Sequence, residues 1–173
     1  MALTIGGQTS ILAPPVARHN PTAGVATYST LQLQPGQFAL HPGPGNQYEK
    51  ARLTISSPGI YAISGNFAGA DVQGTTTDVH ILFNGISIFD GSVNGFGSGT
   101  GPSFSFTKTL AANDALDFAV GFGSNGNFFN DTTALAAQIS AVPEASSASM
   151  FGIGGALLAA LVFLRRKTES CRA

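Results

Sequence analysis

The chain has 173 residues, of which only 10% are charged, and its formal net charge is −1 at pH 7. Gly accounts for 22 residues, and the single cysteine is Cys171. This composition is typical of a turn-rich, all-β domain, and it excludes a disulfide scaffold. Residues 1–141 carry four basic and seven acidic side chains, so no basic face exists that would bind nucleic acid.

Residues 1–24 predict an irregular N-terminal lead, because three Pro interrupt the stretch and its apolar residues follow no period. From residue 25 to 141, short runs of β-type residues alternate with turn signals. We expect eight or nine strands in a single antiparallel β-sandwich, jelly-roll-like in its connections. The expected strands lie in 25–33, 37–45, 50–56, 59–67, 78–83, 86–90, 103–110, 115–122 and 134–140, with a Gly-rich loop at 91–101.

The pair Asn84-Gly85 is the clearest local signal in this body. Both residues tolerate a positive φ, which a two-residue type I′ hairpin requires. The alternation of the preceding run places Val79, Ile81 and Phe83 on the core side of one strand. His80 then points away from that side.

No catalytic motif is present in the sequence: there is no G-x-S-x-G elbow, H-E-x-x-H helix or phosphate-binding loop. The three histidines lie far apart, which disfavours a zinc site. Calcium, with its preference for oxygen ligands, is the better metal candidate. Its candidate ligands are Asp71 and Asp78, which flank 73–77, and the pair Asn130 and Asp131. The alternative is that these side chains only form turns.

Three phenylalanines lie in predicted loops, where an aromatic ring can stack on a sugar. They are Phe96 and the adjacent pair Phe128 and Phe129. The alternative is that these rings cap the open end of the sandwich. The absence of Trp weighs against a dedicated polysaccharide platform.

The stretch from Val142 to Lys167, "VPEASSASMFGIGGALLAALVFLRRK", differs from everything before it. Its apolar part, about 146–164, is long enough to span a bilayer as a helix. Arg165, Arg166 and Lys167 follow at once, and such a cluster stays in the cytoplasm. We therefore expect an external body, one transmembrane helix and a cytoplasmic tail at 168–173. A buried core helix is the alternative.

The order of Val142, Pro143 and Glu144, an apolar span and a basic end resembles the PEP-CTERM sorting signal of Gram-negative bacteria. The family usually has Pro where this chain has Ala145. The resemblance implies processing by an exosortase, removal of the tail and delivery to the cell surface or extracellular matrix. Proteins of this kind also carry an N-terminal signal peptide, which residues 1–20 do not resemble. Either translation starts upstream, which we favour, or the C-terminal helix alone directs export.

The body is similar to the β-sandwich module of many PEP-CTERM proteins, over about 40–140. "GIYAISG" and "LAANDALDF" also resemble trimeric jelly rolls of the complement and tumour-necrosis-factor type. Together these features predict a non-catalytic surface protein, sorted to the envelope or the exopolysaccharide matrix and bound to no cofactor. The alternatives are a glycan-binding module, with or without calcium, and a trimeric ligand-binding jelly roll.

Overall fold

The computed structural model describes residues 3–6, 15–45 and 47–143. Glu144, the apolar stretch at about 146–164 with its expected transmembrane helix, the basic flank of Arg165, Arg166 and Lys167, and the tail lie outside these residues. Within the described part of the chain, no helix is long and apolar enough to cross a membrane.

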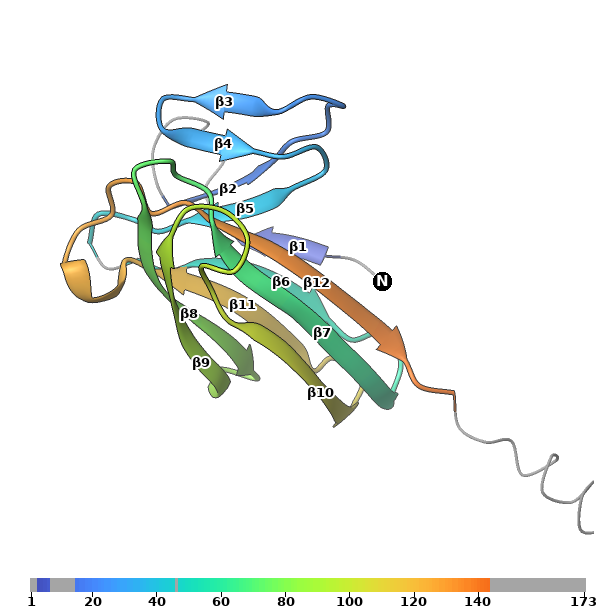
Figure 1. Cartoon of the computed structure of the whole chain (residues 1–173). Coiled ribbons are helices and arrows are strands. Elements are labelled where there is room, and N and C mark those ends of the chain that lie inside the picture. Colours follow the sequence, from blue (N-terminus) through green and yellow to red (C-terminus); the bar gives the residue numbers. More distant parts are fainter. Residues whose placement is uncertain (1–2, 7–14, 46, 144–173) are drawn as a thin grey trace, which may run out of the picture. The chain divides into compact units, whose positions relative to one another are not determined.

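The described residues form an all-β fold of antiparallel sheets, as the sequence predicts (Figure 1). One five-stranded sheet, the first sheet, has the order β1-β6-β11-β8-β9, and the second sheet has the order β10-β7-β12-β5-β2. A separate hairpin pairs β3 with β4. The strands are β1 Leu3–Gly6, β2 Val16–His19, β3 Ala26–Tyr28, β4 Leu31–Leu33, β5 Phe38–His41, β6 Glu49–Thr54, β7 Gly59–Gly69, β8 Thr75–Phe83, β9 Ile86–Gly95, β10 Ser103–Leu110, β11 Ala115–Gly121 and β12 Thr133–Ala141, and η1 is a short 3-10 turn at Gly123–Asn125.

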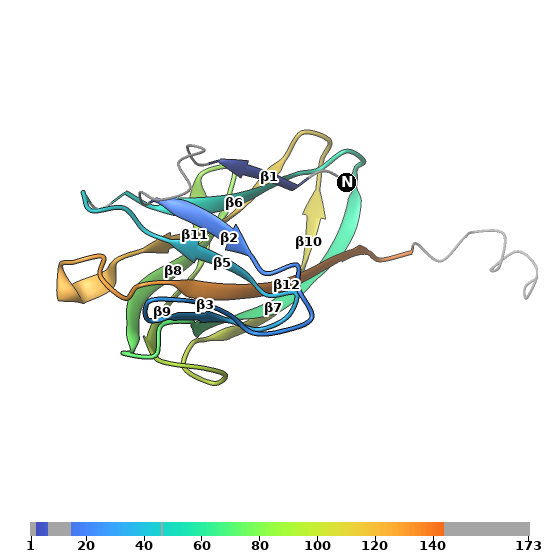
Figure 2. The same cartoon turned by 90° about the horizontal axis from the view of Figure 1, so that it is seen from above.

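The two sheets face each other around one apolar core, in a sandwich-like arrangement that Figures 1 and 2 show from two directions. From β5 onward, successive strands alternate between the sheets, except for the hairpin of β8 and β9 within the first sheet. β6 and β8 contribute alternate side chains to the core, as Val79 and Ile81 of β8 show. The centre of the core is aromatic, with Phe67, Phe104 and Phe118 buried.

The adjacent strands β6 and β11 each carry a buried carboxyl group, Glu49 and Asp117. Asp117 points away from the core side of β11, and Arg52 covers it with two hydrogen bonds, of 2.6 and 2.7 Å, to the two carboxylate oxygens. Glu49 instead shares the inward face of β6 with Ala51 and Leu53. Neither of its carboxyl oxygens has a hydrogen-bond partner among the described residues, and burial raises the pKa of Glu49 to about 7.

The prediction of an irregular lead before residue 25 is wrong. β1 pairs with β6 and β2 pairs with β5, so residues from this stretch form edge strands of both sheets. Each is only four residues long, and four residues are too few to show a period. Their strand conformation depends on partners that lie far along the chain, so the sandwich begins well before residue 25.

Two further boundaries differ from the sequence prediction. The run 25–33 is a hairpin and not one strand, because Ser29 adopts a positive φ of 54° between β3 and β4. β9 continues to Gly95, through the first half of the expected loop at 91–101, because β8 pairs with it as far as Thr75. Val93, in this extension, is buried in the core.

The predicted hairpin at Asn84-Gly85 is confirmed. β8 and β9 are joined there, with Phe83 opposite Ile86, and the two turn residues have φ values of 49° and 85°. Val79 and Ile81 are fully buried, and Phe83 packs against the core while remaining partly exposed. The hydrophobic alternation and the turn chemistry thus agree on one register.

Gly85→Val is expected to lower the free energy of unfolding by about 1–2 kcal/mol, because a β-branched residue is strained at positive φ. No atom lies close to a Cβ at this position, so the loss comes from the backbone alone. Gly24→Val is the matched control, since Gly24 has equally open surroundings but no positive φ. Chemical denaturation measures both variants, and equal stability of the two would contradict the assigned turn.

Candidate functional site

A cavity of about 210 Å³ lies where the β3–β4 hairpin approaches β2, β5 and the segment that leads into β12. Residues from five separate parts of the chain line it. Those with aromatic or polar side chains include Arg18, Tyr28, His41, Asp71, Phe128 and Asn130. The cavity therefore combines rings and hydrogen-bonding groups in one place.

Aromatic rings surround this cavity and remain accessible. Tyr28 is 60% exposed, and the Arg18 guanidinium carbon lies 5.6 Å from the centre of its ring. Phe128 stacks on Phe129, with 4.5 Å between the ring centres, and Phe129 is 67% exposed. The edge of His41 contacts Phe128 at 6.1 Å between centres. These contacts hold the rings in place without covering them.

The polar side chains of the cavity are fixed by hydrogen bonds. Asp71 is buried, and its carboxylate accepts the backbone N–H of Thr132 at 2.7 Å. The Thr30 hydroxyl lies 2.8 Å from Asp71 Oδ1 and 2.9 Å from Asn130 Oδ1, so the two acceptors share one proton. The Asn130 side-chain amide donates to Gln73 at 3.3 Å. A ligand would thus meet preorganised acceptors and donors.

His41 is an uncharged member of this site. Burial lowers the pKa of its imidazole, although the hydrogen bond to the Pro42 carbonyl and the nearby Asp71 charge act in the opposite direction. Because a carbonyl only accepts, Nδ1 carries the proton in that 2.8 Å bond. Nε2 is therefore the acceptor nitrogen, and the ring is neutral at pH 7.

The structure brings together some of the residues that the sequence analysis selected and separates others. Asp71, Asn130 and Phe128 line the one cavity, and Phe129 stacks beside it. Phe96 lies in the loop between β9 and β10, is 42% exposed, and does not line the cavity.

The proposed calcium ligands do not form one group. Asp78 lines a different, polar cavity from the one that Asp71 lines. Asp131 is fully buried, accepts the Thr76 N–H at 2.9 Å, and has its pKa raised to about 6 by burial. Throughout the described ranges, no set of three or more Asp, Glu, His or Cys side chains is placed to hold a metal ion.

The other cavity residues were not identified from the sequence, among them Arg18, Tyr28 and His41. Arg18 lies in the stretch that was expected to be irregular, and Tyr28 lies in a run that was expected to be one strand. The spacing of Arg18, Tyr28 and His41 along the sequence matches no ligand-binding motif. Only the pairing of β2 with β5 and the turn at Ser29 place these side chains around a common space.

A second polar cluster lies on the outer face of the first sheet. His80 points outward, as the alternation predicts, and its two ring nitrogens contact Asp78 at 2.9 Å and Asp90 at 2.5 Å. Tyr48 donates to Asp78 at 2.5 Å, and the Gly123 N–H donates to the same carboxylate at 2.8 Å. Burial lowers the pKa of His80, but its hydrogen bonds to the two aspartates outweigh this effect and raise the pKa.

Comparisons with known proteins do not assign a family. No family model matches the chain, and no curated protein matches it.

Among solved structures, the chain is similar to CBM51 from Clostridium perfringens GH95 in complex with methyl-galactose, at 9% identity over 78% of this chain and 89% of that one, with a TM-score of 0.44. A family 35 carbohydrate binding module from Clostridium thermocellum is similar at 13% identity over 68% and 87%, with a TM-score of 0.40. Pika GITRL is similar at 16% identity over 55% and 75%, with a TM-score of 0.33.

The protonated His80 ring is expected to stabilise the protein in a defined pH range. Because the folded-state pKa is raised, this stabilisation is complete below the unfolded value of about 6.5 and is lost as the pH rises through the folded value. His80→Gln should therefore lower the free energy of unfolding more at about pH 5.5 than at about pH 9. Denaturation at the two pH values measures this, with His19→Gln, at an exposed strand position, as the control. A larger loss at the higher pH would contradict the assigned charge state.

Proposed function

We propose that the chain is an exported, non-catalytic surface protein whose β-sandwich binds a glycan in the cavity lined by Arg18, Tyr28 and Asp71. The observation that carries this proposal is the combination of exposed rings and fixed polar groups around one cavity. The C–H faces of a sugar ring stack on aromatic side chains, while its hydroxyl groups need donors and acceptors in set positions. Both kinds of partner are present here.

The aromatic side chains supply the apolar surface. Tyr28 and Phe129 are among the most exposed large apolar side chains of the described residues; Tyr28 lines the cavity, and Phe129 stacks on the lining residue Phe128. Large apolar side chains that are this exposed reduce solubility and add little to the packing of the core. Their exposure therefore supports a role in contact with a ligand. Phe129 stacks on Phe128, and this contact already restricts the Phe129 side chain. Less side-chain conformational entropy is therefore lost when a sugar binds to the ring.

The polar side chains supply orientation. Asp71 and Asn130 are held by Thr30 and Thr132, so their unused lone pairs and N–H groups keep fixed directions. Arg18 has no carboxylate partner among the described residues, and its donors are available to hydroxyl oxygens. Such preorganisation favours binding because little rotamer freedom is lost.

The carboxylates around the cavity support binding and not hydrolysis. Glycosidases use a pair of carboxyl groups about 5–9.5 Å apart, one on each side of the scissile bond. Asp71 is the one carboxylate that lines this cavity, and it already accepts two hydrogen bonds. Asp131 faces Thr76 and is fully buried.

The resemblance of Val142, Pro143 and Glu144 to a sorting motif supports export and surface delivery by an exosortase-type enzyme. The Val142 N–H donates to the Ile60 carbonyl at 2.8 Å, at the end of the hydrogen-bond ladder between β12 and β7. The backbone hydrogen bonds of the sandwich therefore extend to Val142, the first residue of the motif. Removal of the tail after that point would leave the sheets intact.

Glycan binding is tested with the full chain in lipid nanodiscs on an array of bacterial and plant polysaccharides. Tyr28→Ala and Phe129→Ala should each weaken binding of the recognised glycan about ten-fold, the equivalent of about 1.4 kcal/mol. Phe96→Ala removes an exposed ring outside the cavity and should leave binding unchanged. The result should be the same in calcium and in EDTA, because the described residues bring no three Asp, Glu, His or Cys side chains together around a metal position. Equal binding by all three variants would reject this cavity as the site.

The sorting proposal has its own test in a host that contains an exosortase. Replacing Pro143 and Glu144 by Ala should block removal of the tail, and the uncut protein should accumulate in the inner membrane. Mass spectrometry of the surface form of the unchanged protein should find a C-terminus near Glu144. Gln138→Ala, outside the motif, is the control. A surface form that still contains Lys167 would show that the tail is retained.

A further inference from the structure

One edge of β12 is unpaired along most of its length. β12 pairs with β7 from Thr133 to Ala141, but with β5 only from Thr133 to Leu135. In Figure 1, β12 continues well past the ends of β5 and β2. Among the described residues, the segment Ala136–Ala141 has no strand partner on this side, and we refer to it as the open edge.

The direction of the backbone groups on this open edge follows from neighbouring hydrogen bonds. Thr132 and Val142 direct their bonded C=O and N–H toward β7, so even-numbered residues of β12 face β7. The N–H and C=O groups of Ala137, Ile139 and Ala141 consequently point to the open side. These groups present the hydrogen-bonding pattern of a sheet that lacks its next strand.

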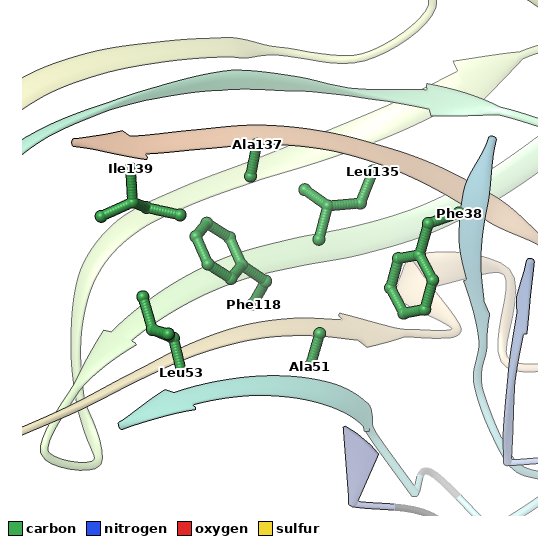
Figure 3. Close-up of a pocket in the computed structure, with 7 residues that line it drawn as sticks. All are labelled: Phe38, Ala51, Leu53, Phe118, Leu135, Ala137 and Ile139. Carbon is green, nitrogen blue, oxygen red and sulfur yellow. The ribbon is translucent and has the colours of Figure 1, made fainter. Parts of the chain in front are cut away.

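An apolar slot of about 360 Å³ lies between the sheets beside the same edge. Figure 3 shows its lining, in which Ala137 and Ile139 of β12 face Leu53 and Phe118 of the first sheet. No charged or polar side chain lines it. Two of the three residues with outward backbone groups, Ala137 and Ile139, thus also border the slot with their side chains.

The other edges of the sandwich carry features that discourage strand addition. On β10, the Lys108 ammonium lies 4.0 Å from the centre of the Phe83 ring and places a charge on the inward side of that edge. β9 carries Asp90, and β2 carries Arg18. β1 has only four residues. β12, with the sequence TALAAQISA, has neither a charge nor a proline.

We propose that the open edge is a docking site for an extended strand of a partner polypeptide. The strand pairs with the backbone of Ala137, Ile139 and Ala141, and its alternate apolar side chains enter the slot. This inference is independent of the glycan site, which lies at the Thr132 end of the strand.

The geometry favours a polypeptide strand over two other occupants. A lipid chain or small apolar molecule would fill the slot but leave the row of N–H and C=O groups unpaired. A second copy paired edge to edge about a two-fold axis meets a steric conflict. β6 and β1 of the first sheet extend beyond β12, under the position that the missing strand would occupy. The first sheets of two such copies would overlap.

The test uses the full chain in lipid nanodiscs and a panel of synthetic peptides about nine residues long, with Val, Ile, Leu or Phe at every second position and Thr between. Hydrogen exchange is measured residue by residue, with and without peptide. Binding should be saturable and should slow the exchange of the Ala137, Ile139 and Ala141 amides by about ten-fold or more. Protection of these amides before any peptide is added would mean that the chain itself or a second copy occupies the edge, and would overturn the proposal.

Ala137→Pro removes an outward N–H and leaves the ladder with β7 intact, because Pro is tolerated where the N–H faces away from the sheet. It should weaken peptide binding about ten-fold or more. Thr107→Pro is the matched control on β10, where the residue is exposed and its N–H points away from β7, and it should bind as the unchanged protein does. A second variant, Ala137→Lys, places a charge over the slot and should have the same effect as Ala137→Pro. Binding that both Ala137 variants retain, no saturable binding by any peptide, or a copurified lipid that peptide does not displace would each refute the proposal.

Discussion

Packing around Phe104 holds the two sheets together. Its ring lies 5.8 Å from Phe89 and 5.8 Å from Phe118 of the first sheet, and 5.7 Å from Phe67 of its own sheet. Offset and edge contacts at these distances add to the burial of a large apolar area. One half of the sandwich is therefore densely filled. The apolar slot lies beside this cluster: Phe118 borders both, and the small side chains of Ala51 and Ala137 are part of the slot's lining.

β12 connects the three features to which we assign a function. Thr132, just before the strand, borders the glycan cavity and holds Asp71. The C-terminal part of the strand carries the open edge, and Val142, the first residue of the sorting motif, makes a backbone bond to Ile60. Because β7 pairs with β12 over its whole length, each feature rests on a rigid strand. Glycan binding, strand docking and tail removal can thus occur on one domain without rearrangement of its sheets.

Only 10% of the residues are charged, and several of the charged side chains discussed above have a partner of opposite charge. Asp117 is paired with Arg52, and His80 is held between two aspartates, so these charges are satisfied. Glu49 is the exception, since it is buried among apolar side chains without a partner in the described part of the chain. With a pKa of about 7, the Glu49 carboxyl group ionises within the physiological pH range, and its ionisation in this buried position is unfavourable.

The sequence by itself determined the all-β class, the positions of most strands between residues 50 and 141, the hairpin at Asn84-Gly85 and the outward direction of His80. These features depend on local alternation and on turn residues that tolerate positive φ, and both are visible within a few positions of the chain. The candidate site was only half visible: Asp71, Phe128 and Asn130 were selected as separate candidates, while Arg18, Tyr28 and His41 were not. The tertiary structure alone decided that these six residues share one cavity and that four-residue strands from the lead complete both sheets. It also decided that β5 begins only at Phe38, opposite Leu135, and so leaves the rest of β12 open among the described residues. Each of these outcomes depends on pairing between segments far apart in the chain, and no local pattern encodes which distant segment a strand will meet.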